Sequence, residues 1–136
     1  VSSADGSGLT YVPGTFYDSH TSALALGENG WVYFTANLEL HGVQVGTANN
    51  WTLPLSGYAG DTVPVVGGDG TVYVTEATST TASVWAITAN GSIRWKKAIA
   101  TYPKATQSEY AILSIAPTGH LMVTTSGDAM LYALGP

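Results

Sequence analysis

The chain has 136 residues, of which 45% are hydrophobic and only 10% are charged, so it has enough apolar material for a folded core. The net charge is −5, and all four basic residues lie between positions 94 and 104. A surface that follows nucleic-acid phosphates needs a broader positive charge, so we expect no nucleic-acid partner. The absence of cysteine excludes disulfides and zinc sites with cysteine ligands.

No apolar run approaches the roughly 20 residues that cross a bilayer, so the sequence predicts no membrane span. The first residues lack the basic and apolar regions of a signal peptide, as in a mature or excised product. Few lysines and many Ser, Thr, Asn and Gly residues resemble the composition of bacterial proteins outside the cytoplasm. We therefore expect an extracytoplasmic protein that is secreted, periplasmic or at the cell surface.

Three segments of the chain resemble one another, and each has the pattern of a strand, a tight turn and a second strand. They are ALGENGWVYFT at 25–35, VGGDGTVYVT at 66–75 and APTGHLMVT at 116–124. The first two turns contain Asn-Gly and Asp-Gly, which favour the positive φ angles of tight hairpins. Such self-similarity predicts equivalent structural units in succession.

Each unit contains four short strands, which we name inner, second, third and outer in chain order. The inner strands are expected at 21–27, 62–67 and 111–116, and the second strands at 31–36, 71–76 and 120–125. Apolar residues fall on both faces of these strands, as in a sheet that lies between two other sheets. The third and outer strands are more mixed in composition, so we expect them nearer to solvent.

The spacing of the units indicates a β-propeller. TANNW at 47–51, TANGSIRW at 88–95 and ADGSGLTY at 4–11 resemble one another, and each ends on an aromatic residue. The separation from that residue to the next turn glycine is the same in the first two cases, Tyr11 to Gly30 and Trp51 to Gly70, and is longer in the third. Four antiparallel strands that recur in this way match propeller blades, whereas a β-sandwich has no reason to repeat itself.

The middle unit, VVGGDGTVYVTEATSTTASVWAITANGSIRW, resembles a repeat of the pyrroloquinoline-quinone (PQQ)-like, or quinoprotein-like, propeller family. The expected fold class is all-β, with about three four-stranded antiparallel blades that form a partial propeller or half of a ring. One propeller segment would cover 1–136, with an outer strand and loop at 1–20, blades at 21–60 and 61–109, and an incomplete blade at 110–136. The resemblance implies that Trp51 and Trp95, which close the repeats, dock between adjacent blades.

Three blades would leave two apolar faces uncovered, because propellers have about four to eight blades. Either the chain is part of a longer propeller that supplies the remaining blades, or two copies form a six-bladed ring. The abrupt beginning within a repeat favours the first arrangement. Residues 9–12 are a candidate for the strand that the last blade lacks.

One face of the predicted propeller carries most of the carboxylates. It holds the loops from outer to inner strands and from second to third strands, where a ligand would bind by analogy with other propellers. The candidate ligand-binding residues are Asp18, His20, Glu39, Asp61, Glu76, Glu109, Asp128, Tyr58 and Tyr102. This acidic mouth suits Ca²⁺, a cationic ligand or sugar hydroxyls. The simpler interpretation is that loops are polar because they meet water.

Asp18, Ser19 and His20 are the residue types of a catalytic triad, but consecutive side chains of an extended segment point to alternating sides. We therefore predict no catalytic residue, and the dispersed histidines predict no metal site. Trp31 and Trp85 are less constrained by the repeat than the other tryptophans. Each is a candidate for core packing or for a platform that stacks on a sugar ring.

The expected function is a non-catalytic binding or scaffold propeller that recognises a polysaccharide or a protein. Two alternatives stay open. One is a fragment of a PQQ-like oxidoreductase, and the other is a fragment of a carbohydrate-active hydrolase or lyase that uses paired carboxylates. The first function needs no cofactor, whereas PQQ or Ca²⁺ belongs to the oxidoreductase alternative.

Overall fold

The computed structural model of the chain describes residues 21–36, 38–59, 62–101, 111–125 and 129–135. These residues form antiparallel β-sheets joined by turns and one short 3-10 helix, η1 (Glu28–Gly30). The all-β class predicted from the sequence is confirmed. The candidate strand at 9–12 lies outside the described residues.

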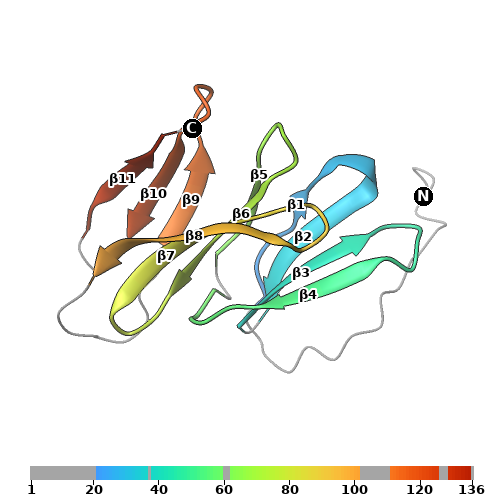
Figure 1. Ribbon diagram of the computed structural model, residues 1–136, viewed down its shortest axis with the longest axis horizontal. Helices are drawn as coiled ribbons and strands as arrows, with labels where there is room; N and C mark the ends of the chain where they lie inside the picture. Colours follow the sequence, from blue (N-terminus) through green and yellow to red (C-terminus); the bar gives the residue numbers. More distant parts are fainter. Residues whose placement is uncertain (1–20, 37, 60–61, 102–110, 126–128, 136) are drawn as a thin grey trace.

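Three sheets follow one another along the chain, and each is a meander of consecutive strands (Figure 1). Sheet I contains β1 (Ala25–Leu26), β2 (Trp31–Ala36), β3 (Glu39–Gln44) and β4 (Asn50–Pro54). Sheet II contains β5 (Val65–Val66), β6 (Val72–Ala77), β7 (Thr81–Ile87) and β8 (Ile93–Thr101). Sheet III contains β9 (Ala111–Ile115), β10 (Leu121–Thr125) and β11 (Leu131–Leu134).

The inner strands β1 and β5 have two residues each and are shorter than the sequence predicts. Before β5, Pro64 has no N–H to donate to a neighbouring strand. Before β1, the hydroxyl of Ser22 accepts a 2.9 Å hydrogen bond from the backbone N–H of Thr35, in place of a regular strand carbonyl. Both inner strands therefore begin later than predicted, and before β1 the pairing returns only as an isolated bridge between Thr21 and Ala36.

The registers of the outer strands are equivalent in sheets I and II. In sheet I, Gly42 of β3 pairs with Trp51 of β4. In sheet II, Ala86 of β7 pairs with Trp95 of β8. The two aromatic residues that mark the repeat therefore occupy the same place in their sheets, opposite a small residue.

The predicted hairpin turns have the expected backbone. Gly30, Gly70 and Gly119 have φ angles of 77°, 78° and 83°, and Asn29 has a φ of 54°. Glycine enters this left-handed region without steric cost, and Asn tolerates it better than most residues. The Asn-Gly and Asp-Gly signals thus mark real turns between the inner and second strands.

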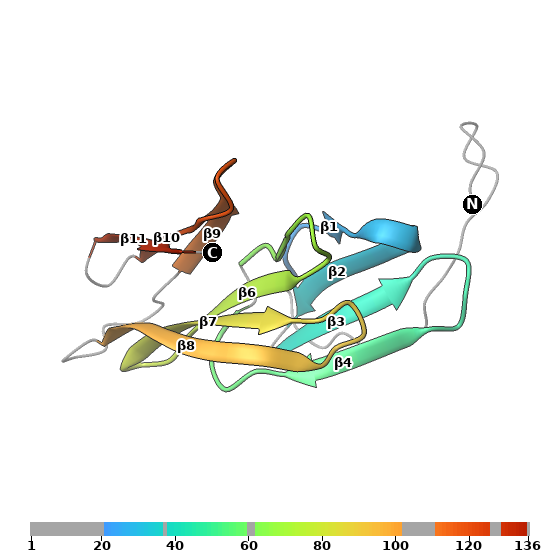
Figure 2. The ribbon, with the colours of Figure 1, turned by 45° about the horizontal axis from the view of Figure 1, so that its top comes forward.

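Consecutive sheets pack against each other, and Figures 1 and 2 show the three sheets side by side in chain order. We call the contact of sheets I and II the first seam, and that of sheets II and III the second seam. Val74 of β6 belongs to the core of the first seam, and Val84 of β7 belongs to that of the second. Both are 0% exposed, so sheet II is buried on both faces. The apolar pattern of the second strand predicts this for β6, whereas the third strand β7 is more buried than its sequence predicts.

Trp51 links the two sheets of the first seam. Its indole Nε1–H donates a 2.9 Å hydrogen bond to the backbone oxygen of Ala89, in the turn between β7 and β8. The indole also lies against Gly42 and Gly91, where a Cβ atom would overlap with the ring. Gly91 has a φ of 87°, so this position needs glycine both for its backbone and for the space it leaves to Trp51.

Buried threonine hydroxyls connect the sheets nearer to the inner strands. Thr35 of β2 donates a 2.7 Å hydrogen bond to the backbone oxygen of Ala59, which leads into sheet II. Thr75 of β6 donates a 2.5 Å hydrogen bond to the backbone oxygen of Ala111 in sheet III. Thr35 and Thr75 are both 0% exposed, so each satisfies a buried carbonyl that water does not reach.

We predict that Gly91→Ala lowers the free energy of unfolding by about 1–3 kcal/mol, because the new Cβ would lie 2.7 Å from the Trp51 ring and the φ angle would be strained. Urea unfolding measures this change. The matched control is Gly68→Ala, since a Cβ atom at Gly68 would meet no atom within 4 Å and the φ angle there is not positive. Equal stability of the two variants would contradict the role of Gly91 in seating Trp51.

Candidate functional site

The structure describes three of the nine predicted ligand-binding residues, namely Glu39, Tyr58 and Glu76. The other six lie outside the described residues: Asp18, His20, Asp61, Tyr102, Glu109 and Asp128. Glu39 is the first residue of β3, and Glu76 is close to the end of β6. Tyr58 pairs with Ala77 in an isolated bridge, so it lies beside the same end of β6 as Glu76.

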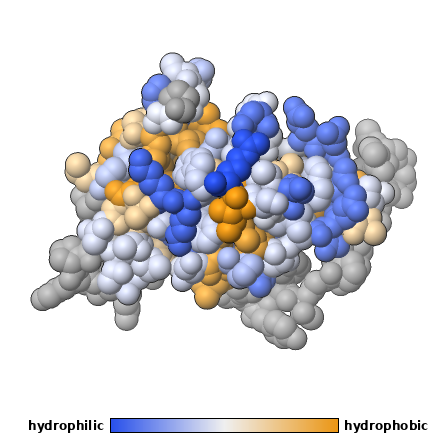
Figure 3. All heavy atoms as spheres, viewed as in Figure 1, coloured by the Kyte–Doolittle hydropathy of each residue, from blue (hydrophilic) through white to orange (hydrophobic). Residues whose placement is uncertain are grey.

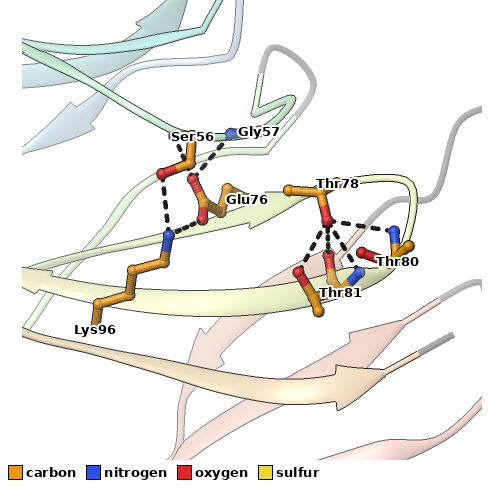
Figure 4. A network of polar contacts seen from close by, with 7 residues as sticks. All are labelled: Ser56, Gly57, Glu76, Thr78, Thr80, Thr81 and Lys96. Atoms are coloured by element: carbon orange, nitrogen blue, oxygen red, sulfur yellow. Dashed lines mark hydrogen bonds and ion pairs between the residues drawn. The ribbon is translucent and has the colours of Figure 1, made fainter.

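Glu76 is buried, with only 1% of its surface exposed, and Figure 4 shows how its carboxylate is held. The backbone N–H groups of Ser56 and Gly57 donate hydrogen bonds of 2.7 and 3.1 Å to its Oε2 atom. The ammonium of Lys96 forms an ion pair with its Oε1 atom. Because this carboxylate is buried and both of its oxygens have partners within the protein, the Glu76 side chain is poorly placed to bind a ligand.

Lys96 completes this network from the outer strand β8. Its Nζ atom donates a 3.1 Å hydrogen bond to the Ser56 hydroxyl and lies 4.3 Å from the centre of the Trp85 ring. A cation over an indole face is stabilised by the ring quadrupole. The network thus fixes the linker after sheet I onto sheet II, and Trp85, at 7% exposure, is a packing residue in this structure.

Glu39 belongs to a different polar cluster. Its carboxylate lies 3.4 Å from Nε2 of His41, and Nδ1 of His41 lies 3.1 Å from the Thr52 hydroxyl. The ring of Phe34 stacks on the imidazole with centroids 5.0 Å apart. Burial lowers the pKa of His41, and the charge of the nearby Glu39 offsets only part of this decrease. This cluster of neighbouring strands in sheet I is separate from Glu76.

A hollow of about 200 Å³ opens at the opposite edge of the first seam, between the turns of sheets I and II. We call it the first hollow. Glu28 and Asn29 of η1, Trp31 and Tyr33 of β2, and Asp69 of the β5–β6 turn contribute to its lining. The rings of Trp31 and Tyr33 are parallel within 2°, with centroids 6.1 Å apart. Aromatic and hydrogen-bonding groups therefore meet at one site.

The Asp69 carboxylate at this hollow is fixed by its neighbours. The Thr71 hydroxyl and backbone N–H donate hydrogen bonds of 2.7 and 3.0 Å to it, and Arg94 forms a 3.1 Å ion pair. The bonds from Thr71, together with the charge of Arg94, lower the pKa of Asp69. The position of Asp69 is thus set before any ligand arrives, and because its side chain is 59% exposed it can accept a further hydrogen bond, unlike the buried Glu76.

The second seam has a hollow of about 320 Å³ at the corresponding edge, which we call the second hollow. Its lining includes Tyr73, Trp95, Lys97 and Gly119. Trp95 occupies the position of Trp51 but is 39% exposed, with its ring centroid 6.0 Å from that of Tyr73. Trp51 crosses a closed part of its seam, whereas Trp95 borders an open one.

The sequence pattern placed the ligand-binding face at the edge that holds the loops from outer to inner strands and from second to third strands, and it indicated only a structural role for the tight turns. Of the residues that line the first hollow, only Trp31 was a candidate for sugar stacking. Glu28, Asn29 and Asp69 were missed because their turn-forming role explains them without any ligand. The approach of two turns from different sheets, which creates the hollow, has no local signal in the sequence.

Within the described ranges, no three His, Asp or Glu residues come close enough together to hold a metal ion. No helix in this part of the chain has the length and apolar character to cross a membrane.

No protein-family model matches the chain, and no curated protein sequence is significantly similar to it. The fold is similar to the crystal structure of a protein of unknown function from Bacteroides caccae, with a TM-score of 0.63 and 14% sequence identity. The match covers 85% of this chain and 41% of that chain. This likeness concerns the fold alone, and the chain spans less than half of the length of that protein.

We predict that Lys96→Met lowers the free energy of unfolding by about 2 kcal/mol, because the buried Glu76 carboxylate loses its counter-charge. This loss of stability is smaller than the loss usual for a fully buried ion pair, because Lys96 is itself partly exposed. The matched control is Lys97→Met, which removes the adjacent charge at the second hollow.

A double-mutant cycle with Glu76→Gln tests the pairing directly. Since both substitutions break the same ion pair, the Glu76→Gln/Lys96→Met protein should lose less stability than the sum of the two single losses. Additive losses, measured by urea unfolding, would contradict an energetically coupled pair.

Proposed function

We propose that this chain is a non-catalytic binding unit built of PQQ-like β-propeller blades, and that it acts outside the cytoplasm. Three successive meanders, two of which have equivalent registers of their outer strands, support the blade interpretation. A buried threonine donates to an equivalent backbone oxygen at both seams, Thr35 to that of Thr62 and Thr75 to that of Ala111. This repetition supports the interpretation further, since blades of one ring meet their neighbours in equivalent ways.

We further propose that the ligand is a polysaccharide and that one of its sugar residues binds in the first hollow. The observation that carries this proposal is the partly exposed ring of Trp31, which stacks on the buried ring of Tyr33 and lies beside the acidic and amide groups of the two turns. Aromatic rings stack on the apolar face of a sugar, while carboxylates and amides accept and donate hydrogen bonds at its hydroxyls. Asp69 is held ready as an acceptor.

The size of the first hollow supports a single sugar residue. Pockets for drug-sized molecules have volumes of roughly 300–1,000 Å³, and the first hollow has about 200 Å³. One ring of a longer glycan would fit, with the rest of the chain passing over the surface. A protein ligand stays as the alternative, in which an exposed side chain would take the place of the sugar.

Binding is favoured over catalysis by the environment of Glu76. Glycoside hydrolysis needs two carboxyl groups that face a shared substrate. Glu76, one of the candidates for such a pair, instead binds two backbone N–H groups and Lys96. Neither PQQ nor Ca²⁺ enters the proposal.

We predict that Trp31→Ala weakens glycan binding at least about tenfold, or about 1.4 kcal/mol, because the stacking surface is lost. A glycan array selects the ligand, and titration calorimetry then compares wild type, Trp31→Ala and Trp31→Phe. The phenylalanine variant should keep part of the affinity. The matched control is Val45→Ala: Val45 is 44% exposed and its N–H bonds to Gly30, so it lies next to the turn that borders the hollow.

Two results would overturn the proposal. One is an array on which no glycan is bound by the wild-type protein. The other is a bound glycan whose affinity is the same for wild type and Trp31→Ala.

A further inference from the structure

Among the described residues, the two outermost sheet faces are equivalent to faces that are buried elsewhere in the structure. We call the face by which a sheet contacts the following sheet its trailing face, and the face by which it contacts the preceding sheet its leading face. Sheet II uses both faces, whereas sheet I has a seam on its trailing face and sheet III has one on its leading face. The strand registers allow the uncovered faces to be compared residue by residue with the covered ones.

On the trailing face of each sheet, the third strand carries an apolar residue at the same position of the repeat. Leu40 of sheet I and Val84 of sheet II are both 0% exposed in their seams. Leu131 of sheet III is 60% exposed. The equivalence follows from pairing, because these residues lie opposite Thr35, Thr75 and Thr124 respectively.

The threonines that lie opposite these apolar residues differ in burial in the same way. Thr35 and Thr75 are buried and donate hydrogen bonds across the first and second seams. Thr124 holds the equivalent position in β10 and is exposed. The trailing face of sheet III therefore has both the apolar residue and the hydroxyl by which the other two sheets bind a following sheet.

The leading faces show the same relation from the other side. Val66 of sheet II and Ile115 of sheet III pack against the cores of their seams. Leu26 of sheet I is the equivalent residue and is 75% exposed. These three residues lie opposite Val32, Val72 and Leu121 of their second strands, which fixes the equivalence.

We propose that the trailing face of sheet III docks on the leading face of sheet I in a second copy of this chain, forming a seam like the two within each copy. The occupant is a second copy because this chain carries both halves of that seam, one at each end of the stack. Figure 3 shows apolar side chains gathered over the region of sheet III. Burial of such surface drives association.

The contact joins two different faces, so it is head-to-tail and must close into a ring to give a defined particle. Two copies would bring together six sheets if each keeps three, which lies within the roughly four to eight blades of known propellers. Closure at six sheets rests on the propeller arrangement proposed above. The seam itself rests only on the equivalence of the faces.

Light scattering after size-exclusion chromatography tests the assembly, and the expected mass is twice the 14.1 kDa of one chain. Leu131→Lys and Leu26→Lys each place a charge on one of the docking faces, and each variant should lose the ring. The matched control is Ile93→Lys, since Ile93 is 51% exposed but lies on the outer strand of the middle sheet. This control should keep the mass of wild type, and far-ultraviolet circular dichroism verifies that all three variants are folded.

Mixing the two face variants gives the sharper result. Each retains one intact face, and these faces are complementary, so an equimolar mixture should form a 1:1 dimer that neither variant forms alone. A monomeric wild-type protein would overturn the proposal. So would a dimer that survives both lysine substitutions, or a pair of variants that does not recombine.

The measurement contains no glycan, so its outcome is separate from that of the sugar-binding proposal. Trp31→Ala should remain a dimer if only the first hollow is altered. A dimer that binds no glycan would contradict only the sugar-binding proposal. A monomer that binds glycan through Trp31 would contradict only the proposed assembly.

Discussion

The structure depends on one constraint, which is that every sheet has apolar side chains on both of its faces. A sheet of this kind gains most of its stability by burying both faces, since the hydrophobic free energy scales with the area removed from water. Sheet II meets this condition, with Val74 and Val84 fully buried on opposite sides. The same condition is unmet at Leu26 and Leu131, where the stack ends.

Polar contacts give the seams their geometry. The hydroxyls of Thr35 and Thr75 each bind a backbone carbonyl that packing has removed from water, and the Trp51 indole binds a partly buried carbonyl. Such bonds contribute modestly to stability but are costly to leave unmade, so they select one way of stacking the sheets. The Glu76–Lys96 network likewise holds the linker that follows sheet I against sheet II. The hollows lie where the turns of stacked sheets face each other.

The part of the fold that the sequence predicts is local. Glycine at 30, 70 and 119 marks tight turns because its backbone enters the left-handed region, and the structure confirms those turns. Strand identity and the order of the sheets follow from composition and repetition. Strand lengths were less predictable: β1 and β5 begin later than expected, after Ser22 and Pro64, whose effects depend on how neighbouring strands pair.

The candidate site was predicted less well, for a physical reason. In the sequence Glu76 is one more carboxylate at a loop edge, and its partner Lys96 is distant in the chain and lies on another strand. Asp69 has the pattern of a turn residue, although the turn brings it to a hollow with Trp31. By itself the sequence determined the all-β class, the turns and the repeated units, because these depend on residues close together in the chain. Only the tertiary structure decided which polar groups have partners within the protein and which sheet faces are uncovered, because both depend on how one sheet packs against the next.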